Sequence, residues 1–377
     1  MPESSFDLAV VGAGVVGLAC ALAAARLGKR VVVVDRDAQA NGASVRNFGF
    51  VTVTGQARGE MWRRARRARQ VWAEVADLAG IPILHEGLAM TARRAESVAV
   101  LEAFMDTEMG EGCRLLAAAE LRRWFPDLAG QGVMAGLVSP HDLRVESREA
   151  IPRLAAWLEE RHGVEFRRGA AVTAVETSTL TTSRGILRAD AIVVCPGDDL
   201  VTLFPERLAG VTRCKLQMLR LADPGFRLPA AVMSDLGLVR YAGYADLPQA
   251  AALRARLEAE QADHLAHGVH LIVVQAANGE LIVGDSHHYG PTPDPFASEA
   301  VDRLILEEFA AVFGREAPPV RERWTGTYAS ASDRMVLIDT PADGVRLVTV
   351  TTGAGASTAF AIGEEVIGDL FGQRIDT

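Results

Sequence analysis

The stretch from Phe6 to Asp35, FDLAVVGAGVVGLACALAAARLGKRVVVVD, constrains the fold of this chain more than any other feature. An apolar run, Leu8 to Val11, leads into the glycine-rich sequence GAGVVG, and an alanine-rich helical pattern follows. A second apolar run then ends at Asp35. This order predicts a strand, a glycine turn, a helix and a second parallel strand, the unit that binds dinucleotides.

Each glycine of this turn has a physical task. Gly12 forms the tight turn, Gly14 lets the backbone approach a pyrophosphate, and Gly17 lets helix and strand pack closely. The helix N-terminus directs its unpaired N–H groups and positive dipole end at the phosphates. Asp35 is expected to accept hydrogen bonds from a ribose diol. The expected cofactor contacts in this unit are Gly12, Gly14, Val16, Gly17, Asp35 and Arg36.

Bulk properties limit the possible partners. A chain of 377 residues favours two domains. The formal net charge of −9 argues against nucleic acid or an anionic membrane surface as the main partner. No apolar run is long enough to span a bilayer, and the first strand starts too early for a signal peptide, so we expect a cytoplasmic protein. The sequence leaves the oligomeric state open.

The nucleotide-binding pattern is interrupted and later resumed. Residues 191–195 form a short apolar strand far from the first unit, and 345–350 form another before a second glycine turn. We therefore expect an α/β protein with a Rossmann-like nucleotide-binding domain and an inserted antiparallel-sheet α+β substrate domain. The expected domains are 1–80, 140–210 and 330–377 for the first, and 81–139 and 211–329 for the second.

The inserted part is rich in expected strands, among them 214–221, 236–244, 269–275 and 281–284. A helix expected over 60–79 carries many arginines, which form either an anion-binding face or an ordinary solvated surface. His264, His267 and His270 have a spacing that resembles metal ligands, but they do not share one face and no acid completes a set, so we expect no metal.

The second glycine turn, TGAGAS at 352–357, lies between a strand and a helix. A turn that opens a helix presents positive potential at its mouth, where it can stabilise a reduced, anionic cofactor ring. The alternative is a simple tight connection. The residues assigned to the cofactor here are Gly353, Gly355, Ala356, Ser357 and Thr358.

In combination these features resemble the D-amino acid oxidase-like flavoprotein superfamily, in the branch with glycine oxidase and monomeric sarcosine oxidase. The resemblance covers essentially the whole chain. Besides the two glycine turns it depends on Ala43 and Ser44, Val172, the Cys195 to Gly197 segment, and the WTGTY sequence at 324–328. SVRNFGFVTVTGQ, RCKLQMLR, GELIVGDSHHYG and ERWTGTYA resemble more narrowly a subgroup associated with phosphonate catabolism.

The resemblance implies FAD as cofactor and the oxidation of a carbon–nitrogen bond to an imine, which water hydrolyses, with dioxygen as the acceptor. It adds Ala43, Ser44, Asn47, Val172, Cys195 and Gly197 to the expected FAD contacts. Three departures matter. The relatives' covalent flavin cysteine corresponds to Gly326, so the FAD is expected to be non-covalent. Their carboxylate-binding arginine and lysine correspond to Tyr328 and Ser357, which favours a different substrate anion, such as a phosphonate.

Candidate catalytic residues are His287 and Tyr328. A protonated His287 could stabilise superoxide-like charge above the flavin, or it could simply end a hairpin. The candidate substrate-binding residues are Arg46, Tyr241, Tyr289 and Lys215. For Arg46 and Lys215 the alternative is a surface role, and for the tyrosines it is packing. Lys215 and Gln217 share one strand face, so both could face the flavin.

The expected activity is the oxidation of a small zwitterionic amine resembling primary or N-alkylated 2-aminoethylphosphonate. Three alternatives remain open at this point: a glycine, sarcosine or D-amino acid oxidase, a flavin-binding dehydrogenase subunit without oxidase chemistry, and an NAD-dependent dehydrogenase.

Overall fold

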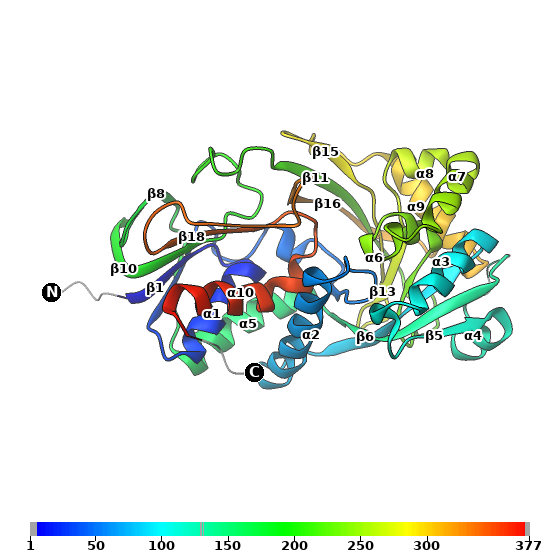
Figure 1. The fold of residues 1–377 in the computed structure, drawn as a ribbon, viewed down its shortest axis with the longest axis horizontal. Coiled ribbons are helices and arrows are strands. Elements are labelled where there is room, and N and C mark those ends of the chain that lie inside the picture. The colour runs from blue at the N-terminus through cyan, green and yellow to red at the C-terminus, as the bar shows by residue number, and fades with distance from the viewer. Residues whose placement is uncertain (1–5, 129, 131, 374–377) are drawn as a thin grey trace.

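The computed structural model describes residues 6–128, 130 and 132–373. Two sheets dominate it and lie at opposite ends of an elongated molecule, with helix α2 (Glu60–Leu78) between them (Figure 1). The expected α/β architecture, with one parallel nucleotide-type sheet and one largely antiparallel sheet, is confirmed. Among the described residues, no helix is both long and apolar enough to cross a bilayer.

The first sheet has the strand order β17-β18-β10-β1-β2-β7, and its strands from β18 to β7 run parallel. Strand β17 pairs antiparallel with β18, while β8 and β9 extend an antiparallel hairpin from the start of β10. The strands are β1 (Phe6–Val11), β2 (Val31–Asp35), β7 (Glu165–Arg168), β8 (Val172–Glu176), β9 (Thr179–Thr182), β10 (Gly185–Val194), β17 (Val336–Asp339) and β18 (Val345–Val350).

Helices α1 (Val15–Arg26), α5 (Ser147–His162) and α10 (Gly355–Phe371) lie together along one face of this sheet (Figure 1). Helices α1 and α10 pack closely because Gly363 has no side chain: a Cβ there would lie 2.7 Å from the backbone carbon of Ala19. Each of these two helices follows a strand that pairs with β10, so both begin at the same edge of the sheet. The fold thus brings the two glycine turns together.

The arginine-rich helix α2 uses part of its charge to hold α10. Arg64 pairs with Glu365 and Arg67 with Glu364, each with N–O distances of 2.7 Å. The indole Nε1 of Trp72 donates to the carbonyl of Ala356 at the start of α10. Arg64 and Arg67 are therefore neither an anion-binding face nor simply solvated, because they hold α10 against α2, while Trp72 fixes the second glycine turn from outside.

The second sheet has the order β15-β11-β14-β13-β12-β4-β6-β3, with β16 paired to β11 and β5 to β6. Its neighbours are antiparallel except β12 and β4. The strands are β3 (Phe50–Val51), β4 (Ile83–Ala92), β5 (Arg114–Ala117), β6 (Ala135–Val145), β11 (Thr212–Leu221), β12 (Ala231–Met233), β13 (Ile272–Gln275), β14 (Leu281–Gly284), β15 (His288–Gly290) and β16 (Val320–Ser330).

Helices cover both faces of this sheet. Buried side chains of α3 and α7, such as Phe104 and Leu253, pack on one face, and Phe309 of α9 packs on the other. The helices are α3 (Ala95–Met105), α4 (Ala118–Trp124), α6 (Ala242–Ala245), α7 (Ala250–Glu260), α8 (Ala262–Ala266) and α9 (Glu299–Phe313). We propose the expected two-domain division, with β3 and the whole of β6 assigned to the second sheet's domain because they pair there.

The strand expected over 236–244 is wrong. Asp235–Val239 forms a short 3₁₀ helix, and Ala242–Ala245 forms α6. The cause lies in Asp235, whose fully buried carboxylate accepts hydrogen bonds from the amide of Arg93, the guanidinium of Arg94 and the hydroxyl of Ser97. This buried anchor turns the chain away from the sheet, and the apolar residues that follow fill the core from a helical turn.

Replacing this anchor by Asp235→Ala should lower the free energy of unfolding by about 3 to 5 kcal/mol, because it removes a fully buried carboxylate that pairs with Arg94 and leaves the Ser97 hydroxyl and the Arg93 amide without their acceptor. Urea denaturation measures the change. The matched control is Asp246→Ala at the exposed end of α6, where we expect a change within about 0.5 kcal/mol. Equal effects of the two substitutions would contradict the anchoring role.

Candidate active site

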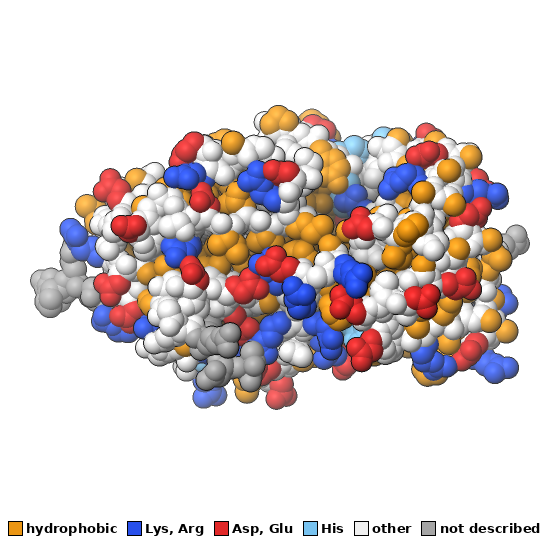
Figure 2. Space-filling model, in the orientation of Figure 1, with side chains coloured by type: hydrophobic (Ala, Val, Ile, Leu, Met, Phe, Trp, Pro, Cys, Tyr) orange, Lys and Arg blue, Asp and Glu red, His pale blue; other side chains and the backbone are white. Residues whose placement is uncertain are grey.

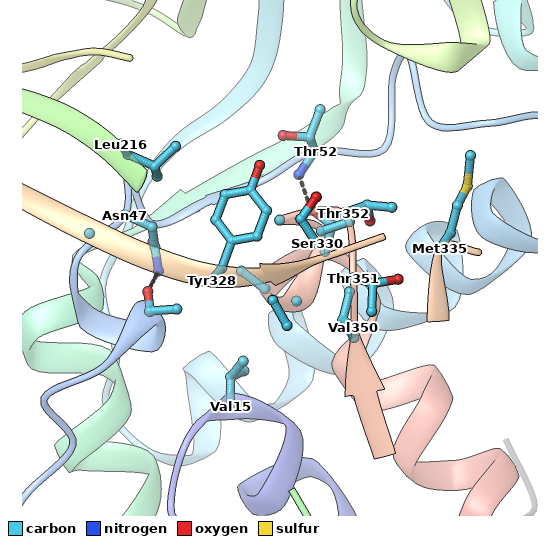
Figure 3. Close-up of a pocket in the computed structure, with 18 of the residues that line it drawn as sticks. Val15, Asn47, Thr52, Leu216, Tyr328, Ser330, Met335, Val350, Thr351 and Thr352 are labelled. Atoms are coloured by element: carbon cyan, nitrogen blue, oxygen red, sulfur yellow. Dashed lines mark hydrogen bonds between the residues drawn. The ribbon is translucent and has the colours of Figure 1, made fainter. Parts of the chain in front are cut away.

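A cavity of about 440 Å³ opens where the two sheets meet. Its walls come from the first glycine turn, the 43–48 segment, strand β16, and the end of β18 with the start of α10. In the space-filling view, hydrophobic side chains gather near the middle of the face, between the two sheet-bearing ends (Figure 2). Figure 3 shows Tyr328, Thr351, Val15 and Leu216 around the cavity.

The first glycine turn has the geometry that the sequence predicted. Gly12 has φ +103°, and a Cβ there would lie 2.5 Å from the carbonyl oxygen of Cys195. A Cβ on Gly17 would collide with the carbonyl oxygen of Gly12. The Asp35 carboxylate accepts the amides of Ala13 (2.6 Å) and Asp37 (2.8 Å), one on each oxygen. Each oxygen retains a lone pair for a ribose hydroxyl.

The 43–48 segment packs directly on this turn. The Ser44 hydroxyl accepts the amide of Val15, the first residue of α1. The Asn47 side chain is fully engaged, since its amide nitrogen donates to Ala43 and its oxygen accepts from Gly49 and Ser147. Asn47 thus fixes the conformation of this cavity wall. Arg46 also lines the cavity, and its guanidinium donates to Asn41.

The second glycine turn lies opposite. Helix α10 begins at Gly355, four residues before the expected helix at 359, and no side chain caps its first amides. The Ser357 hydroxyl accepts the amide of Thr52, and the Thr358 hydroxyl donates to the carbonyl of Ala354. The ring of Tyr328 packs over Gly353, where a Cβ would lie 3.1 Å from its Cζ. The N-terminus of α10 therefore faces the cavity without a side-chain cap, and the Tyr328 ring lies over the turn that precedes it.

A guanidinium that the sequence analysis did not single out lies in the cavity wall. Arg240 is half-buried, follows the 3₁₀ helix and donates to the Tyr289 hydroxyl at 3.1 Å. Burial disfavours its charge, but Tyr328, Tyr289 and Asp285 outweigh this effect and raise the pKa of Arg240. Tyr289 is 56% exposed, so this pair lies at the solvent side of the cavity.

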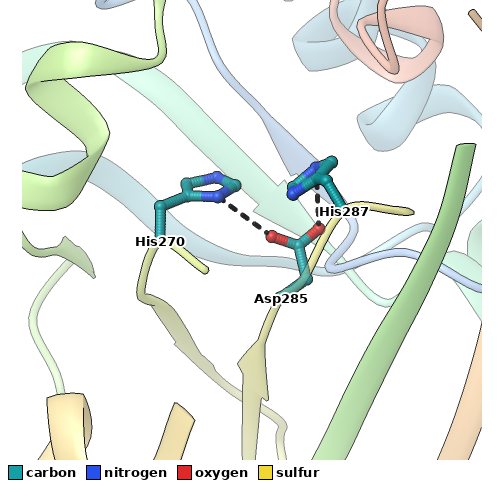
Figure 4. A group of neighbouring side chains, drawn as sticks. All are labelled: His270, Asp285 and His287. Carbon is teal, nitrogen blue, oxygen red and sulfur yellow. Dashed lines mark ion pairs between the residues drawn. The ribbon is translucent and has the colours of Figure 1, made fainter. Parts of the chain in front are cut away.

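His270, Asp285 and His287 form a buried cluster on the same cavity, with ligand-type atoms within 4.8 Å of one another (Figure 4). His270 and Asp285 exchange backbone hydrogen bonds that extend the β13–β14 ladder, which brings their side chains together. These residues differ from the His264, His267 and His270 set whose spacing resembled metal ligands. The His267 and His288 rings pair separately, with 2.9 Å between nitrogens.

Protonation in this cluster differs from the expectation for His287. Burial and the charge of Arg240 lower the pKa of both His270 and His287 well below the ordinary value. Burial raises the pKa of Asp285 to about 7. His287 is therefore neutral at pH 7, and the positive charge in this part of the cavity wall comes from Arg240 instead.

Most of the expected site residues line this one cavity. They are Gly14, Val16, Gly17, Ala43, Ser44, Arg46, Asn47, Cys195, Gly197, Tyr241, His287, Tyr289, Tyr328, Gly353, Gly355, Ala356 and Ser357. Gly12, Asp35 and Thr358 lie behind its wall and shape the two turns. Arg36 is exposed and pairs with Asp199, and Val172 is buried in β8. The placement of these two in an adenine or ribose site remains a prediction.

Lys215 does not face the cavity. Its ammonium group binds both carboxylate oxygens of Asp294 and the carbonyl of Phe296, while Gln217 binds Ser298 and Asp302. Leu216, between them on β11, lines the cavity. Since strand side chains alternate between faces, Lys215 and Gln217 point to the opposite side. They do share one face, as expected, and this face is turned away from the cavity.

The sequence analysis gave no role in this cavity to Arg240, His270 or Asp285, although it considered His270 as a metal ligand and Asp285 lies within GELIVGDSHHYG. Their signal was weak because the three residues come from different segments that only the fold brings to one cavity. One available clue was Asp285, a carboxylate placed directly after the apolar strand Leu281–Gly284.

The site fits FAD on its own geometry. A glycine turn without room for side chains opens α1, a second uncapped helix N-terminus faces it, and a cavity connects the two. The sequence profile of the DAO family, described as FAD dependent oxidoreductase, matches residues 7–368. The chain belongs to this family of FAD-dependent oxidoreductases. The expectations of an FAD cofactor and an oxidoreductase are thereby confirmed.

Comparisons with individual proteins agree with this assignment. The bifunctional protein ThiO/ThiG of Nostoc sp. is 29% identical over 237 residues, which are 58% of this chain and 34% of that protein. This chain therefore spans about a third of its curated relative. Among solved structures, glycine oxidase from Bacillus cereus has a TM-score of 0.78 at 17% identity, covering 98% of this chain and 95% of that one. L-proline dehydrogenase from P. horikoshii has a TM-score of 0.80 at 18% identity, covering 100% and 96%.

The close contact at the first glycine turn predicts the effect of Gly17→Ala. The added methyl group would collide with the Gly12 carbonyl and push α1 away from β1, so the purified variant should contain little FAD. Flavin absorbance per protein measures this loss. Gly290→Ala is the control, since a Cβ there meets nothing within 4 Å. Full FAD content in the Gly17 variant would contradict the close-packing argument.

The absence of a cysteine at Gly326 predicts non-covalent FAD. A Cβ at this position would lie 3.1 Å from the backbone oxygen of Arg46, so the strand approaches the 43–48 segment closely there. Acid precipitation should release all of the flavin into the supernatant. Yellow colour retained by the precipitated protein would show a covalent link to another residue.

Proposed function

We propose that this protein uses FAD to oxidise the C–N bond of a small zwitterionic amine whose anionic group is a phosphonate. The expected substrates are primary or N-alkylated 2-aminoethylphosphonates. Their imine products hydrolyse to phosphonoacetaldehyde and an amine, and dioxygen is the proposed electron acceptor. When bound, FAD accepts the hydride equivalent from the carbon that carries nitrogen. The chain's own residues bind, orient and deprotonate the substrate.

The observation that carries this proposal is the Arg240 guanidinium in the cavity wall, hydrogen-bonded to Tyr289. The Tyr289 oxygen accepts from Arg240, so its own hydroxyl hydrogen is available to an anion. A guanidinium is a planar donor fork that remains charged and matches the oxygens of carboxylates and phosphonates. Arg240 and Tyr289 together therefore form an anion-binding pair near the cavity mouth.

The number of donors favours a phosphonate over a carboxylate. The hydroxyl of Tyr328 lines the same cavity, and Arg46 contributes a second guanidinium to its wall. A phosphonate offers three oxygens and up to two negative charges, so it can use more of these donors than a carboxylate can. The sequence resemblance to a phosphonate-associated subgroup supports the same choice, as do Tyr328 and Ser357 at the positions of the relatives' carboxylate anchors.

The His270–Asp285–His287 cluster supports a zwitterion. Asp285 lines the cavity with His270 and His287, and it offers a carboxylate to the amine. A substrate with an anion at one end and an ammonium group at the other would meet complementary charge at both. The names of the structural neighbours, glycine oxidase and L-proline dehydrogenase, support C–N oxidation and provide the alternative that the substrate is an amino acid.

Matched substrate pairs decide between these two possibilities. The measurement is the bleaching of the holoenzyme's flavin by substrate without oxygen, expressed as rate divided by half-saturation concentration. This value should be higher with 2-(methylamino)ethylphosphonate than with N-methyl-β-alanine, its carboxylate counterpart. Glycine and sarcosine extend the comparison. Faster bleaching by the carboxylates would assign the amino acid alternative. Hydrogen peroxide release in air tests dioxygen as acceptor.

Arg240→Met should lower kcat/KM for the phosphonate by roughly 30-fold to several thousand-fold, since the bound phosphonate loses its hydrogen-bonded charge partner, at a cost of about 2 to 5 kcal/mol. The control is Arg256→Met on the exposed face of α7, which leaves the cavity intact. An unchanged kcat/KM in the Arg240 variant, with FAD retained, would remove Arg240 from the anion site.

A further inference from the structure

The His270–Asp285–His287 cluster has a proton arrangement that its hydrogen bonds define in part. Nδ1 of His287 lies 2.9 Å from the carbonyl oxygen of Gly268. A carbonyl oxygen only accepts, so this nitrogen carries the hydrogen of the neutral ring. Nε2 of His287 is then a lone pair, and it lies 3.7 Å from Oδ2 of Asp285. A lone pair and a carboxylate oxygen therefore face each other with no hydrogen between them.

His270 completes the other side of the carboxylate. Its Nδ1 lies 3.3 Å from Oδ1 of Asp285, and its Nε2 lies 3.3 Å from the Tyr241 hydroxyl. A hydroxyl can donate or accept, so His270 can hold its hydrogen on either nitrogen. Neither Nδ1 of His270 nor Oδ1 of Asp285 has another hydrogen-bond partner among the described residues. The two imidazoles thus frame one carboxylate and leave room for one more proton.

The cluster is removed from bulk water but open to the substrate. His270, Asp285 and His287 are 2%, 5% and 7% exposed, yet all three line the cavity that Arg240 and Tyr289 also line. A buried carboxylate that faces lone pairs is poorly stabilised as an anion, which makes it a good proton acceptor. A substrate whose anionic group is bound at Arg240 would place an N–H of its ammonium group at this carboxylate.

We propose that the Asp285 carboxylate, framed by His270 and His287, accepts the ammonium proton of the bound substrate and so produces the neutral amine that can be oxidised. This inference rests on the proposed function and adds the residue that prepares the substrate. Asp285 is the catalytic residue in this step, whereas His270 and His287 position it and share the proton.

The step balances without any redox partner. One N–H bond of the ammonium ion breaks, its electron pair stays on nitrogen, and an O–H bond forms on Asp285. The amine becomes neutral and the cluster loses its negative charge. The freed nitrogen lone pair is what later forms the second bond of the imine when hydride leaves the neighbouring carbon. An ammonium nitrogen has no such pair, so the proton must leave first.

The charged and titratable groups around Asp285 tune this exchange. Burial raises the pKa of Asp285 to about 7, and the nearby Arg240 charge limits the rise, so the carboxylate can exchange a proton near neutral pH. The groups that face the cluster from the packed elements are Arg240, Tyr241, Tyr289, Tyr328, Cys214, His267 and His288. The deprotonated carboxylate is the active form, so substrate capture should increase as pH rises through the pKa of Asp285.

The test is flavin reduction of the holoenzyme by 2-(methylamino)ethylphosphonate without oxygen, from about pH 6 to about pH 9. In the wild type, the rate divided by half-saturation concentration should rise with pH through the ionisation of Asp285, in addition to that of the substrate's own phosphonate. In Asp285→Asn the ionisation of Asp285 should vanish while that of the substrate stays, and the value should fall about 10²- to 10⁴-fold. Asp263→Asn on the exposed helix α8 is the matched control and should keep the wild-type profile.

A second measurement is independent of substrate turnover. Infrared spectra of the holoenzyme should show a protonated carboxyl band that disappears between acid and alkaline pH in the wild type and is missing in Asp285→Asn. Melting temperature and FAD content establish that the variant folds. If it does not fold, His287→Gln replaces it, and it should move the pH of half-maximal rate without abolishing reduction.

The outcomes separate the two proposals. If the wild type is reduced by amines and Asp285→Asn matches its rates and profile, the role of Asp285 is overturned while the proposed function stands. If no amine reduces the wild type, the proposed function fails, and the infrared band still decides whether Asp285 holds a proton. A stoichiometric metal ion in the holoenzyme, needed for activity and removed by chelators, would also overturn the inference, since a cation would take the proton's place.

Discussion

The close contact between α1 and α10 is the constraint on which the rest of this structure depends. Gly363 lets the backbone of α10 approach Ala19 of α1, and β10 lies between the strands that precede the two helices. Two helix N-termini, separated by more than three hundred residues of sequence, therefore begin beside one cavity. A long dinucleotide needs both ends, one for its diphosphate and one for its electron-rich ring. The rest of the molecule closes the space between them.

The cavity wall near Arg240 carries groups of both charges. Arg240 and Tyr289 place positive charge and a hydroxyl donor at the mouth, while Asp285 with its two histidines lies on another part of the wall. The buried histidines remain neutral because burial and Arg240 both oppose their protonation. The cavity wall therefore holds the guanidinium groups of Arg240 and Arg46 and one carboxylate that can exchange a proton. This pattern complements a molecule with charges of both signs.

The features that sequence alone could predict are local. The glycine turns, Asp35 and the strands around them follow from short patterns whose spacing is set by one turn and one helix, and the structure contains them as expected. Arg240 was missed for the opposite reason. The segment 236–244 has the apolar composition of a strand, but the buried contacts of Asp235 with Arg94 and Ser97 turn it into 3₁₀ and α-helical turns. Such long-range contacts leave no local signal.

Strand alternation explains the error at Lys215 in a similar way. The sequence shows that Lys215 and Gln217 share a face, but the side that carries the cavity depends on how β11 packs between β14, β15 and β16. The Asp285 cluster shows the same limit, because His270 and Asp285 are brought together only by the pairing that extends β13 and β14. The sequence gives the identity of each side chain, but strand pairing in the folded protein determines which residues that side chain contacts.

The position of Arg240 has a consequence for how such a protein can change. It is carried by a short turn fastened through Asp235 to β4 and α3, whereas the two glycine turns belong to the other sheet. Under the anion-binding role proposed for Arg240, substitutions in this turn would exchange one preferred anion for another and leave the two glycine turns intact. The determinants of anion preference and of coenzyme binding would then lie on separate elements, and directed evolution towards other anions would begin at residues 235–245.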